Sequence, residues 1–149
     1  MNEHSITELQ NWIGRSEIVK DVISLSTVAN MSATIGSSPD ELQHGSPLPP
    51  CWHWLFFNRG AQSEKLRLDG TYADSDYMPP ISLPRRMWVG NKIEINKPLT
   101  IGSAARRISI IEEITEKTGL SGRLIFLRER MEITDDNCAY LVWKRRRYF

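Results

Sequence analysis

The amino-acid sequence predicts an α+β domain in which helices pack on one face of an antiparallel sheet. Three observations predict this class. Residues 1–36 carry helix-start signals and apolar residues at helical spacing, and residues 37–86 are repeatedly interrupted by proline. Residues 87–149 combine β-branched runs and alternating positions with turn sequences, which is typical of consecutive strands joined by hairpins.

The first predicted element is a short helix near the N-terminus. Ser5 and Glu8 have the S-x-x-E spacing of a capping box, in which the two side chains accept hydrogen bonds from otherwise unpaired backbone amides. Leu9, Trp12 and Ile13 then repeat at helical spacing. Gly14 is placed to end this helix.

The next segment fits two structures. Four apolar residues fall on one helical face and predict a helix: Ile18, Val22, Leu25 and Ala29. The many β-branched residues in its first half favour the alternative, a strand over residues 17–23.

The middle third is irregular, because residues 37–86 hold all but one of the eight prolines. The apolar stretch Cys51–Phe57 interrupts this irregular segment, and Pro49-Pro50 before it predicts the first turn of a helix. So long an irregular segment in a small domain is usually functional.

The C-terminal part predicts four strands, over residues 87–94, 106–115, 125–133 and 140–144. The turn sequences at 117–122 and 134–137 join the last three strands as hairpins.

Alternation along the third of these strands predicts two different faces. Its apolar face holds Ile125, Leu127, Met131 and Ile133, and its polar face holds Arg128, Arg130 and Glu132. In the strand before it, Ile108, Ile111 and Ile114 also fit helical spacing. We prefer a strand there, because a glycine turn joins this run directly to a clear strand.

Length and composition limit the function classes. The 149 residues predict one domain over residues 1–149, and 40% hydrophobic with 25% charged residues is the balance of a globular protein. We expect no membrane span and no signal peptide, which predicts a cytoplasmic location. A net charge of +1 gives no reason to expect nucleic-acid binding. Cys51 and Cys138 fit neither a disulfide framework nor a metal site.

Several motifs resemble one known family. The stretches LPPCWHWLFF at residues 48–57 and LPRRMWVG at residues 83–90 are similar to the N-terminal half of the MaoC-like hydroxyacyl-thioester dehydratases and mesaconyl-C4-CoA hydratases. WIGR at residues 12–15, the glycine turn at 117–122 and YLVWK at 140–144 support the same resemblance.

The resemblance implies a hot-dog fold, in which a curved antiparallel sheet wraps around a helix. That helix is expected to include residues 52–57 or 26–35. Family members add water across the double bond next to the carbonyl of an acyl thioester, or remove water to form that double bond. The resemblance therefore implies an acyl-coenzyme A or acyl-carrier-protein substrate, with coenzyme A or phosphopantetheine as part of the substrate and no separate cofactor.

One family motif is missing. Full-length members resemble two hot-dog halves in one chain, and their hydratase signature, roughly D-x-N-P-x-H, lies in the second half. This sequence contains no such motif, so we expect a free-standing first half, either a natural subunit or a fragment. A lone hot-dog sheet also leaves an exposed edge, which predicts a homodimer or a heterodimer with a catalytic hot-dog subunit.

Water addition needs acid and base groups, so each histidine is a candidate. His4 lies at the terminus and is set aside. Asp40 and His44 superficially imitate an acid–base pair, but their polar surroundings favour a solvated loop. His53, between two tryptophans, fits either core packing or a site role.

The substrate-binding candidates are aromatic and basic side chains: Trp52, His53, Trp54, Arg85, Arg86 and Trp88. The aromatic residues could line an acyl site or simply form core. Arg85 and Arg86 could hold a phosphate of the carrier, because guanidinium groups match phosphate oxygens, or lie in solvent. The basic run Lys144–Arg147 could bind nucleic acid or phosphate, but such a run is more often solvated, and we expect it to be so here.

Two functions follow as expectations. The first is a substrate-binding, non-catalytic component of an acyl-thioester hydratase or dehydratase. The alternative is a non-enzymatic module that binds acyl thioesters or regulates by doing so.

Overall fold

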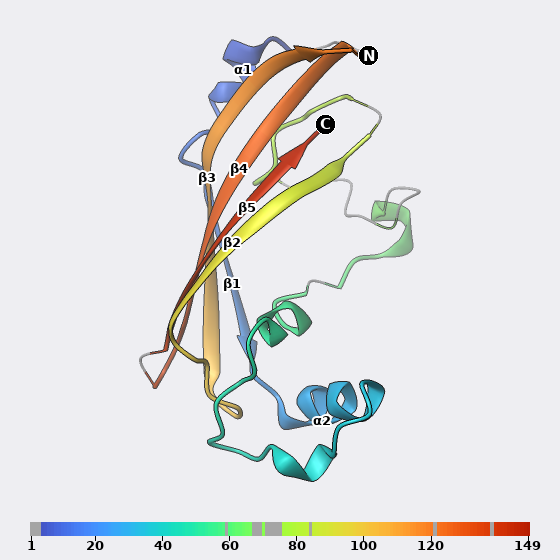
Figure 1. The fold of residues 1–149 in the computed structure, drawn as a ribbon. Coiled ribbons are helices and arrows are strands. Elements are labelled where there is room, and N and C mark those ends of the chain that lie inside the picture. The colour runs from blue at the N-terminus through green and yellow to red at the C-terminus, as the bar shows by residue number, and fades with distance from the viewer. Residues whose placement is uncertain are drawn as a thin grey trace.

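The computed structural model describes residues 4–58, 60–66, 70, 76–83, 85–120, 122–137 and 139–149. In this part of the chain five strands form one antiparallel sheet in the order β1-β3-β4-β5-β2 (Figure 1). The strands are β1 (Ser16–Val22), β2 (Met87–Lys97), β3 (Ala104–Gly119), β4 (Gly122–Asp135) and β5 (Tyr140–Tyr148). The predicted antiparallel sheet and α+β class are confirmed.

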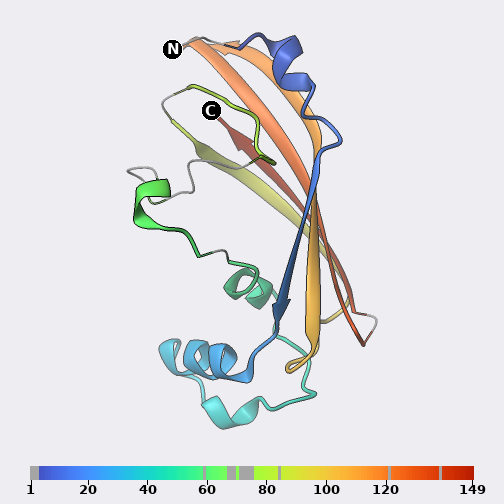
Figure 2. The ribbon, with the colours of Figure 1, turned by 180° about the vertical axis from the view of Figure 1, so that it is seen from behind.

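The long hairpin of β3 and β4 dominates the sheet. Its pairing runs from Ala105 opposite Asp135 to Gly119 opposite Gly122, with one irregularity after Ile111. Because Ile108, Ile111 and Ile114 are all paired with β4, the helical alternative for this segment is wrong. Figures 1 and 2 show that the strands twist and curve together, which gives the sheet a concave side.

The N-terminal capping box is confirmed. Helix α1 (Ile6–Gln10) begins after Ser5, whose backbone N–H donates to Glu8 Oε2 at 2.8 Å while the Glu8 N–H donates to Ser5 Oγ at 3.2 Å. Gly14 follows the helix at φ +87°, a conformation that favours glycine, and donates its N–H to the Ile111 carbonyl at 2.9 Å.

Residues 16–34 form a strand followed by a helix, so the prediction of one continuous helical face is wrong. The strand alternative is confirmed, because β1 pairs with β3 over its whole length. Alternation then leaves Ile18 and Val22 exposed while Val19 is buried. Helix α2 (Leu25–Thr34) begins only after Ser24, whose hydroxyl accepts from the Thr27 N–H at 3.4 Å.

The helix predicted over residues 51–57 is also wrong. Only the 3-10 turn η2 (Trp52–Leu55) forms there. Cys51 and Phe57 have positive φ angles of 68° and 63°, and a left-handed residue on each side prevents a right-handed helix from extending. Two further 3-10 turns lie in the irregular middle third, η1 (Pro39–Glu41) and η3 (Ser63–Lys65).

The core divides into two clusters. The lower cluster contains buried residues of β1, α2, the segment just after η2 and the adjoining strand segments, among them Val19, Val28, Phe56, Met131 and Trp143. The upper cluster joins α1 and the segment at 77–81 to the far ends of β3 and β4, and includes Leu9, Tyr77, Ile111, Leu127 and Phe149. The predicted apolar face of β4 is confirmed, since Ile125, Leu127, Met131 and Ile133 are buried.

Helix α2 and η2 both lie on the concave side (Figures 1 and 2). Of the two segments expected to supply the hot-dog helix, residues 26–35 match α2. The helix is short, however, and lies near the end of β1, so η2 covers more of the middle of the sheet. No helix among the described residues is long and apolar enough to cross a membrane.

Candidate functional site

A pocket of about 440 Å³ lies on the concave side, between η2 and the middle of the sheet. We call it the aromatic pocket. Its walls come from η2, the residues just after it, and strands β2 to β5: His53, Trp54, Phe56, Phe57, Asn58, Trp88, Asn91, Arg107, Ile133, Trp143 and Arg145.

Three aromatic rings meet at one wall of the pocket. The His53 ring lies 5.6 Å from the Trp54 ring and 5.4 Å from the Trp143 ring, edge to face in both cases. Trp54 and Trp143 are 5.7 Å apart. These separations are within the range in which aromatic pairs attract, so the three rings support one another.

His53 is a neutral group in this wall. Its side chain is buried, and this desolvation lowers its pKa to about 4, because burial disfavours the charged imidazolium. At neutral pH the uncharged imidazole can therefore donate one hydrogen bond through one ring nitrogen and accept one through the other.

Some polar atoms in the pocket walls are buried with no hydrogen-bond partner among the described residues. They include His53 Nε2, Asn91 Oδ1 and Trp143 Nε1. Buried polar atoms normally have partners, since an unpaired one loses its hydration without replacement. Their concentration around one pocket indicates a place where a polar ligand can bind.

The loop after η2 is tied to β1. The Phe57 N–H donates to Asp21 Oδ2 at 2.7 Å, although Phe57 itself adopts a positive φ. This contact holds Phe56 and Phe57 against the sheet. The far end of the pocket wall is therefore positioned by β1 rather than by a regular helix.

Two arginines line the pocket. Arg107 on β3 lies 3.6 Å from Glu17 of β1, and its guanidinium is 5.7 Å from the Phe57 ring. Arg145 on β5 stacks over Trp143 at 5.1 Å. No aspartate or glutamate is among the described residues that line the pocket.

Beside the pocket, Glu129 of β4 is buried at 1% exposure between two arginines. Arg145 donates to its carboxylate through Nε at 3.2 Å and Nη2 at 3.3 Å, and Arg147 Nη2 donates to Oε2. The Tyr77 hydroxyl donates to Oε1 at 3.4 Å. We call these four residues the Glu129 cluster.

The cluster keeps its carboxylate ionised. Burial by itself would raise the pKa of Glu129, but the charges of Arg147 and Arg145 outweigh it and lower that pKa. Burial also raises the pKa of Tyr77, and the nearby carboxylate adds to this effect. Tyr77 is thus a neutral donor, and the cluster has two cations for one anion.

The structure brings together three of the predicted substrate-binding residues, His53, Trp54 and Trp88, at the aromatic pocket. Trp52 is half-buried and packs against the lower cluster. Arg85 is exposed, and Arg86 is half-buried with its guanidinium 5.1 Å from the Phe149 ring. These last three residues are not part of the pocket lining.

Asp40 and His44 lie elsewhere. Asp40 is in η1 and His44 follows it in a loop beside Gly102, and both are exposed. In the described part of the chain, no hydrogen bond or ion pair joins them. Neither residue lines the aromatic pocket.

Sequence reasoning missed Asn91, Arg107, Trp143 and Glu129, and it considered Arg145 only as a member of the basic run Lys144–Arg147. The expectation that the run Lys144–Arg147 is solvated is wrong for half of its members. β5 continues to Tyr148, beyond the predicted end at residue 144, so alternate residues Arg145 and Arg147 point to the concave side. Alternation starting from Trp143 could have revealed them.

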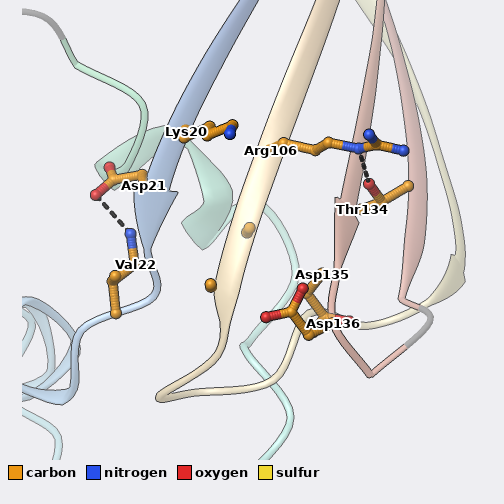
Figure 3. A pocket seen from close by; sticks show the side chains of 9 residues that line it. Lys20, Asp21, Val22, Arg106, Thr134, Asp135 and Asp136 are labelled. Atoms are coloured by element: carbon orange, nitrogen blue, oxygen red, sulfur yellow. Dashed lines mark hydrogen bonds between the residues drawn. The ribbon is translucent and has the colours of Figure 1, made fainter.

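A wider depression of about 740 Å³ lies across the ends of β1, β3 and β4 (Figure 3). Its polar groups mostly serve the fold. Arg106 donates to Thr134 Oγ1 at 3.2 Å, and Asp135 accepts hydrogen bonds from the Thr100, Asn137 and Ala139 amides. We therefore regard this depression as structural.

The aromatic pocket has the properties of a binding site. It offers apolar rings for a hydrocarbon group, unpaired polar atoms and guanidinium groups for oxygen atoms. Among the described residues, no group of three His, Cys, Asp or Glu side chains could hold a metal ion.

Comparison with solved structures shows that this curved antiparallel sheet, with a helix and a pocket on its concave side, is a hot-dog fold. A MaoC-like dehydratase from Rhodospirillum rubrum superposes with a TM-score of 0.57 over 91% of this chain and 90% of its own, at 11% identity. A chain of the ChsH1-ChsH2 complex from Mycobacterium tuberculosis superposes with a TM-score of 0.67, over 96% of this chain and 87% of that chain, at 12% identity. At these identities the likeness concerns the fold.

The chain belongs to the hydroxyacyl-thioester dehydratase type 2 family, whose sequence profile matches residues 51–148. It is 42% identical over 116 residues to the mesaconyl-C(4)-CoA hydratase of Chloroflexus aurantiacus. That alignment covers 78% of this chain and 41% of the relative, so the chain spans about two fifths of that relative's length. The resemblance seen in the sequence motifs is confirmed.

Proposed function

We propose that this chain is the substrate-binding half of an acyl-thioester hydratase or dehydratase and works together with a catalytic hot-dog partner. The observation that carries the proposal is the aromatic pocket. Its walls are rich in aromatic rings and contain buried polar atoms without hydrogen-bond partners among the described residues, and none of its described lining residues is acidic. Membership of the dehydratase family and the named activity of the Chloroflexus relative support it.

The chemistry explains the need for a partner. Hydration of an enoyl thioester needs one group to take a proton from water and another to deliver a proton to the α-carbon. In the pocket, His53 is a titratable group with suitable chemistry, but its lowered pKa makes it a weak base, and no carboxylate among the described lining residues orients it. We therefore assign the acid–base groups to the partner.

The acyl part of the substrate binds in the pocket, and the carrier part binds at its rim. The acyl group occupies the aromatic pocket beside His53, Trp54 and Trp88. Arg85 and Arg86 immediately precede β2, which carries Trp88. A carrier that leaves the pocket along this strand reaches the two guanidinium groups with its phosphates.

The partner interface is assigned to the edge of the sheet. β2 is the last strand in the sheet order, and it exposes three consecutive apolar residues, Met87, Trp88 and Val89. An unpaired edge with apolar side chains favours association. Two of the solved structures with this fold are complexes, ChsH1-ChsH2 and HadBC.

The test is reconstitution. The chain is purified alone and together with a protein that carries the D-x-N-P-x-H signature, and hydration of short enoyl thioesters is followed by the loss of their absorbance. We expect little or no turnover by the chain alone and turnover by the complex.

Two outcomes would contradict the proposal. Robust turnover by the chain alone, abolished by Asp40→Asn or His44→Ala, would place catalysis at η1 and the loop that follows it. Thioester binding without turnover in any complex would favour the non-enzymatic module instead.

A further inference from the structure

The Glu129 cluster has an unbalanced charge. Arg145 and Arg147 both bind the Glu129 carboxylate, and no other carboxylate among the described residues lies within ion-pair distance of either guanidinium. The second contact of Arg147 is to Met78 Sδ at 3.5 Å, which carries no charge. One positive charge is therefore left without a counterion at a largely buried position.

The surplus charge belongs to the side that faces the pocket. Arg145 lines the aromatic pocket, whereas Arg147 does not. Arg145 uses Nε and Nη2 to hold Glu129, so its Nη1 has no hydrogen-bond partner among the described residues. The side chain of Arg145 is 27% exposed, and it shares its one carboxylate partner with Arg147. A ligand that supplies an anion can therefore form a charge-assisted hydrogen bond with Arg145 from the pocket.

The surroundings favour an anionic oxygen group. Trp143 Nε1 is buried without a hydrogen-bond partner among the described residues of the same pocket, and an indole nitrogen can only donate. His53 Nε2 donates or accepts according to its tautomer, and Asn91 Oδ1 accepts, so the pocket also has room for a neutral polar group of the ligand. The indole donor together with the guanidinium of Arg145 matches a carboxylate or a phosphate.

We propose that Arg145 determines ligand specificity by binding an anionic oxygen group of the thioester. This inference rests on the proposed function and names the substrate class more closely. The anion has two possible sources with the same chemistry, a free carboxylate on the acyl group or a phosphate of the carrier.

One substitution in the Glu129 cluster tests the role of Arg145 without leaving a buried carboxylate unpaired. In Arg145→Met, Glu129 keeps Arg147 as a one-to-one partner, so the carboxylate is not left unpaired. We expect this variant to fold, with circular dichroism and the urea midpoint as the check. The matched control is Arg146→Met, because Arg146 is an arginine on the same strand that is exposed and lies over Phe126 rather than in the pocket.

Binding is measured by calorimetry with four thioesters. Glutaconyl and pent-2-enoyl groups have the same chain length and differ in the terminal carboxylate. Each is attached either to coenzyme A or to N-acetylcysteamine, which has no phosphate. These four ligands separate the two sources of the anion.

If the acyl carboxylate is the anion, Arg145→Met weakens binding of both glutaconyl thioesters about tenfold or more and leaves both pent-2-enoyl thioesters unchanged. If the carrier phosphate is the anion, the same variant weakens both coenzyme A thioesters and leaves the N-acetylcysteamine thioesters unchanged. Arg146→Met changes none of the four.

A failure of this inference can be distinguished from a failure of the proposed function. Equal effects of Arg145→Met on all four ligands, or no effect on any of them, would overturn this inference while the proposed function stands. Absence of binding of all four ligands to the unmodified chain would overturn the proposed function and this inference with it.

Discussion

The ring of His53 packs edge to face against the ring of Trp143, with centroids 5.4 Å apart and planes at 67°. The contact joins the 3-10 turn η2 to strand β5, two elements that are far apart in the sequence. It buries the imidazole, which lowers its pKa to about 4. His53 is thus packed among aromatic rings and at the same time lines the aromatic pocket.

The burial of His53 predicts a pH-dependent stability. In the unfolded chain this histidine takes up a proton as the pH falls below about 6.5, whereas the folded protein takes it up only near pH 4. Its contribution is therefore complete above pH 6.5 and is lost between pH 6.5 and 4, by up to about 3 kcal/mol. Urea unfolding as a function of pH measures it.

His53→Phe is the control for this effect, because phenylalanine keeps a ring against Trp54 and Trp143 and cannot titrate. The difference in unfolding free energy between the two proteins should change across that pH window. A constant difference from pH 7 to pH 4 would show that the imidazole is not protected from protonation in the folded state.

Glu129→Gln should strongly destabilise the fold. Removing the carboxylate leaves Arg145 and Arg147 largely buried beside each other, and breaking a buried ion pair in this way costs about 3–5 kcal/mol. Urea unfolding at pH 7 measures the loss. Glu132→Gln on the same strand is the control, because its ion pair with Arg130 is partly exposed and is worth about 1 kcal/mol or less. Similar losses in both variants would contradict the burial argument.

Asp135→Ala should destabilise the turn between β4 and β5. The carboxylate accepts from the Thr100 and Ala139 amides at 2.8 Å, from Asn137 at 2.9 Å and from Ser103 Oγ at 3.1 Å. Losing these bonds should cost about 2–4 kcal/mol in thermal or urea unfolding.

The neighbouring Asp136→Ala is the matched control, since among the described residues Asp136 makes a hydrogen bond through its backbone N–H, to the Ala104 carbonyl, and none through its carboxylate. Its unfolding free energy should change by less than about 0.5 kcal/mol. A loss as large as that of Asp135→Ala would mean that the acidic turn acts through net charge instead.

Cys51→Gly should stabilise the protein. Cys51 is exposed at φ +68°, where a side chain costs about 1–2 kcal/mol that glycine avoids. The greater freedom of glycine in the unfolded chain offsets part of this, so we expect a net gain of about 0.5 kcal/mol. Cys51→Ala keeps the strained backbone and should bring no gain. A lower thermal midpoint for the glycine variant would refute the prediction.

Arg86→Ala should raise KM for a coenzyme A thioester more than it lowers kcat in the reconstituted enzyme. A phosphate contact acts equally on the ground state and the transition state, so its loss weakens binding without slowing the chemistry. Steady-state kinetics with coenzyme A and N-acetylcysteamine thioesters measure the separate changes in KM and kcat. An equal rise in KM for both carriers would indicate lost packing against Phe149 in place of a lost phosphate contact.

Local patterns in the sequence predicted much of the fold. The capping box at Ser5 and Glu8 and the apolar face of β4 depend on residues within a few positions of one another, so the sequence contains the information directly. The motifs around residues 48–57 and 83–90 likewise led to the family.

Where local patterns competed, only long-range pairing decided the outcome. Residues 16–22 fit a helix or a strand by spacing, and the pairing of β1 with β3 selects the strand. The apolar run at residues 51–57 fits a helix, and the positive φ angles of Cys51 and Phe57 prevent one. Such backbone conformations depend on contacts like that of Phe57 with Asp21, 36 residues away.

The composition of the site was also decided by tertiary structure. The sequence singled out His53, Trp54 and Trp88 as candidate binding residues, because their residue types and motifs were recognisable locally. It could not show that Arg145 would lie beside the pocket with Glu129 shared between two arginines. That arrangement arises because β4 and β5 pair in a register that places Glu129 opposite Arg145, and cross-strand register is a property of the folded sheet.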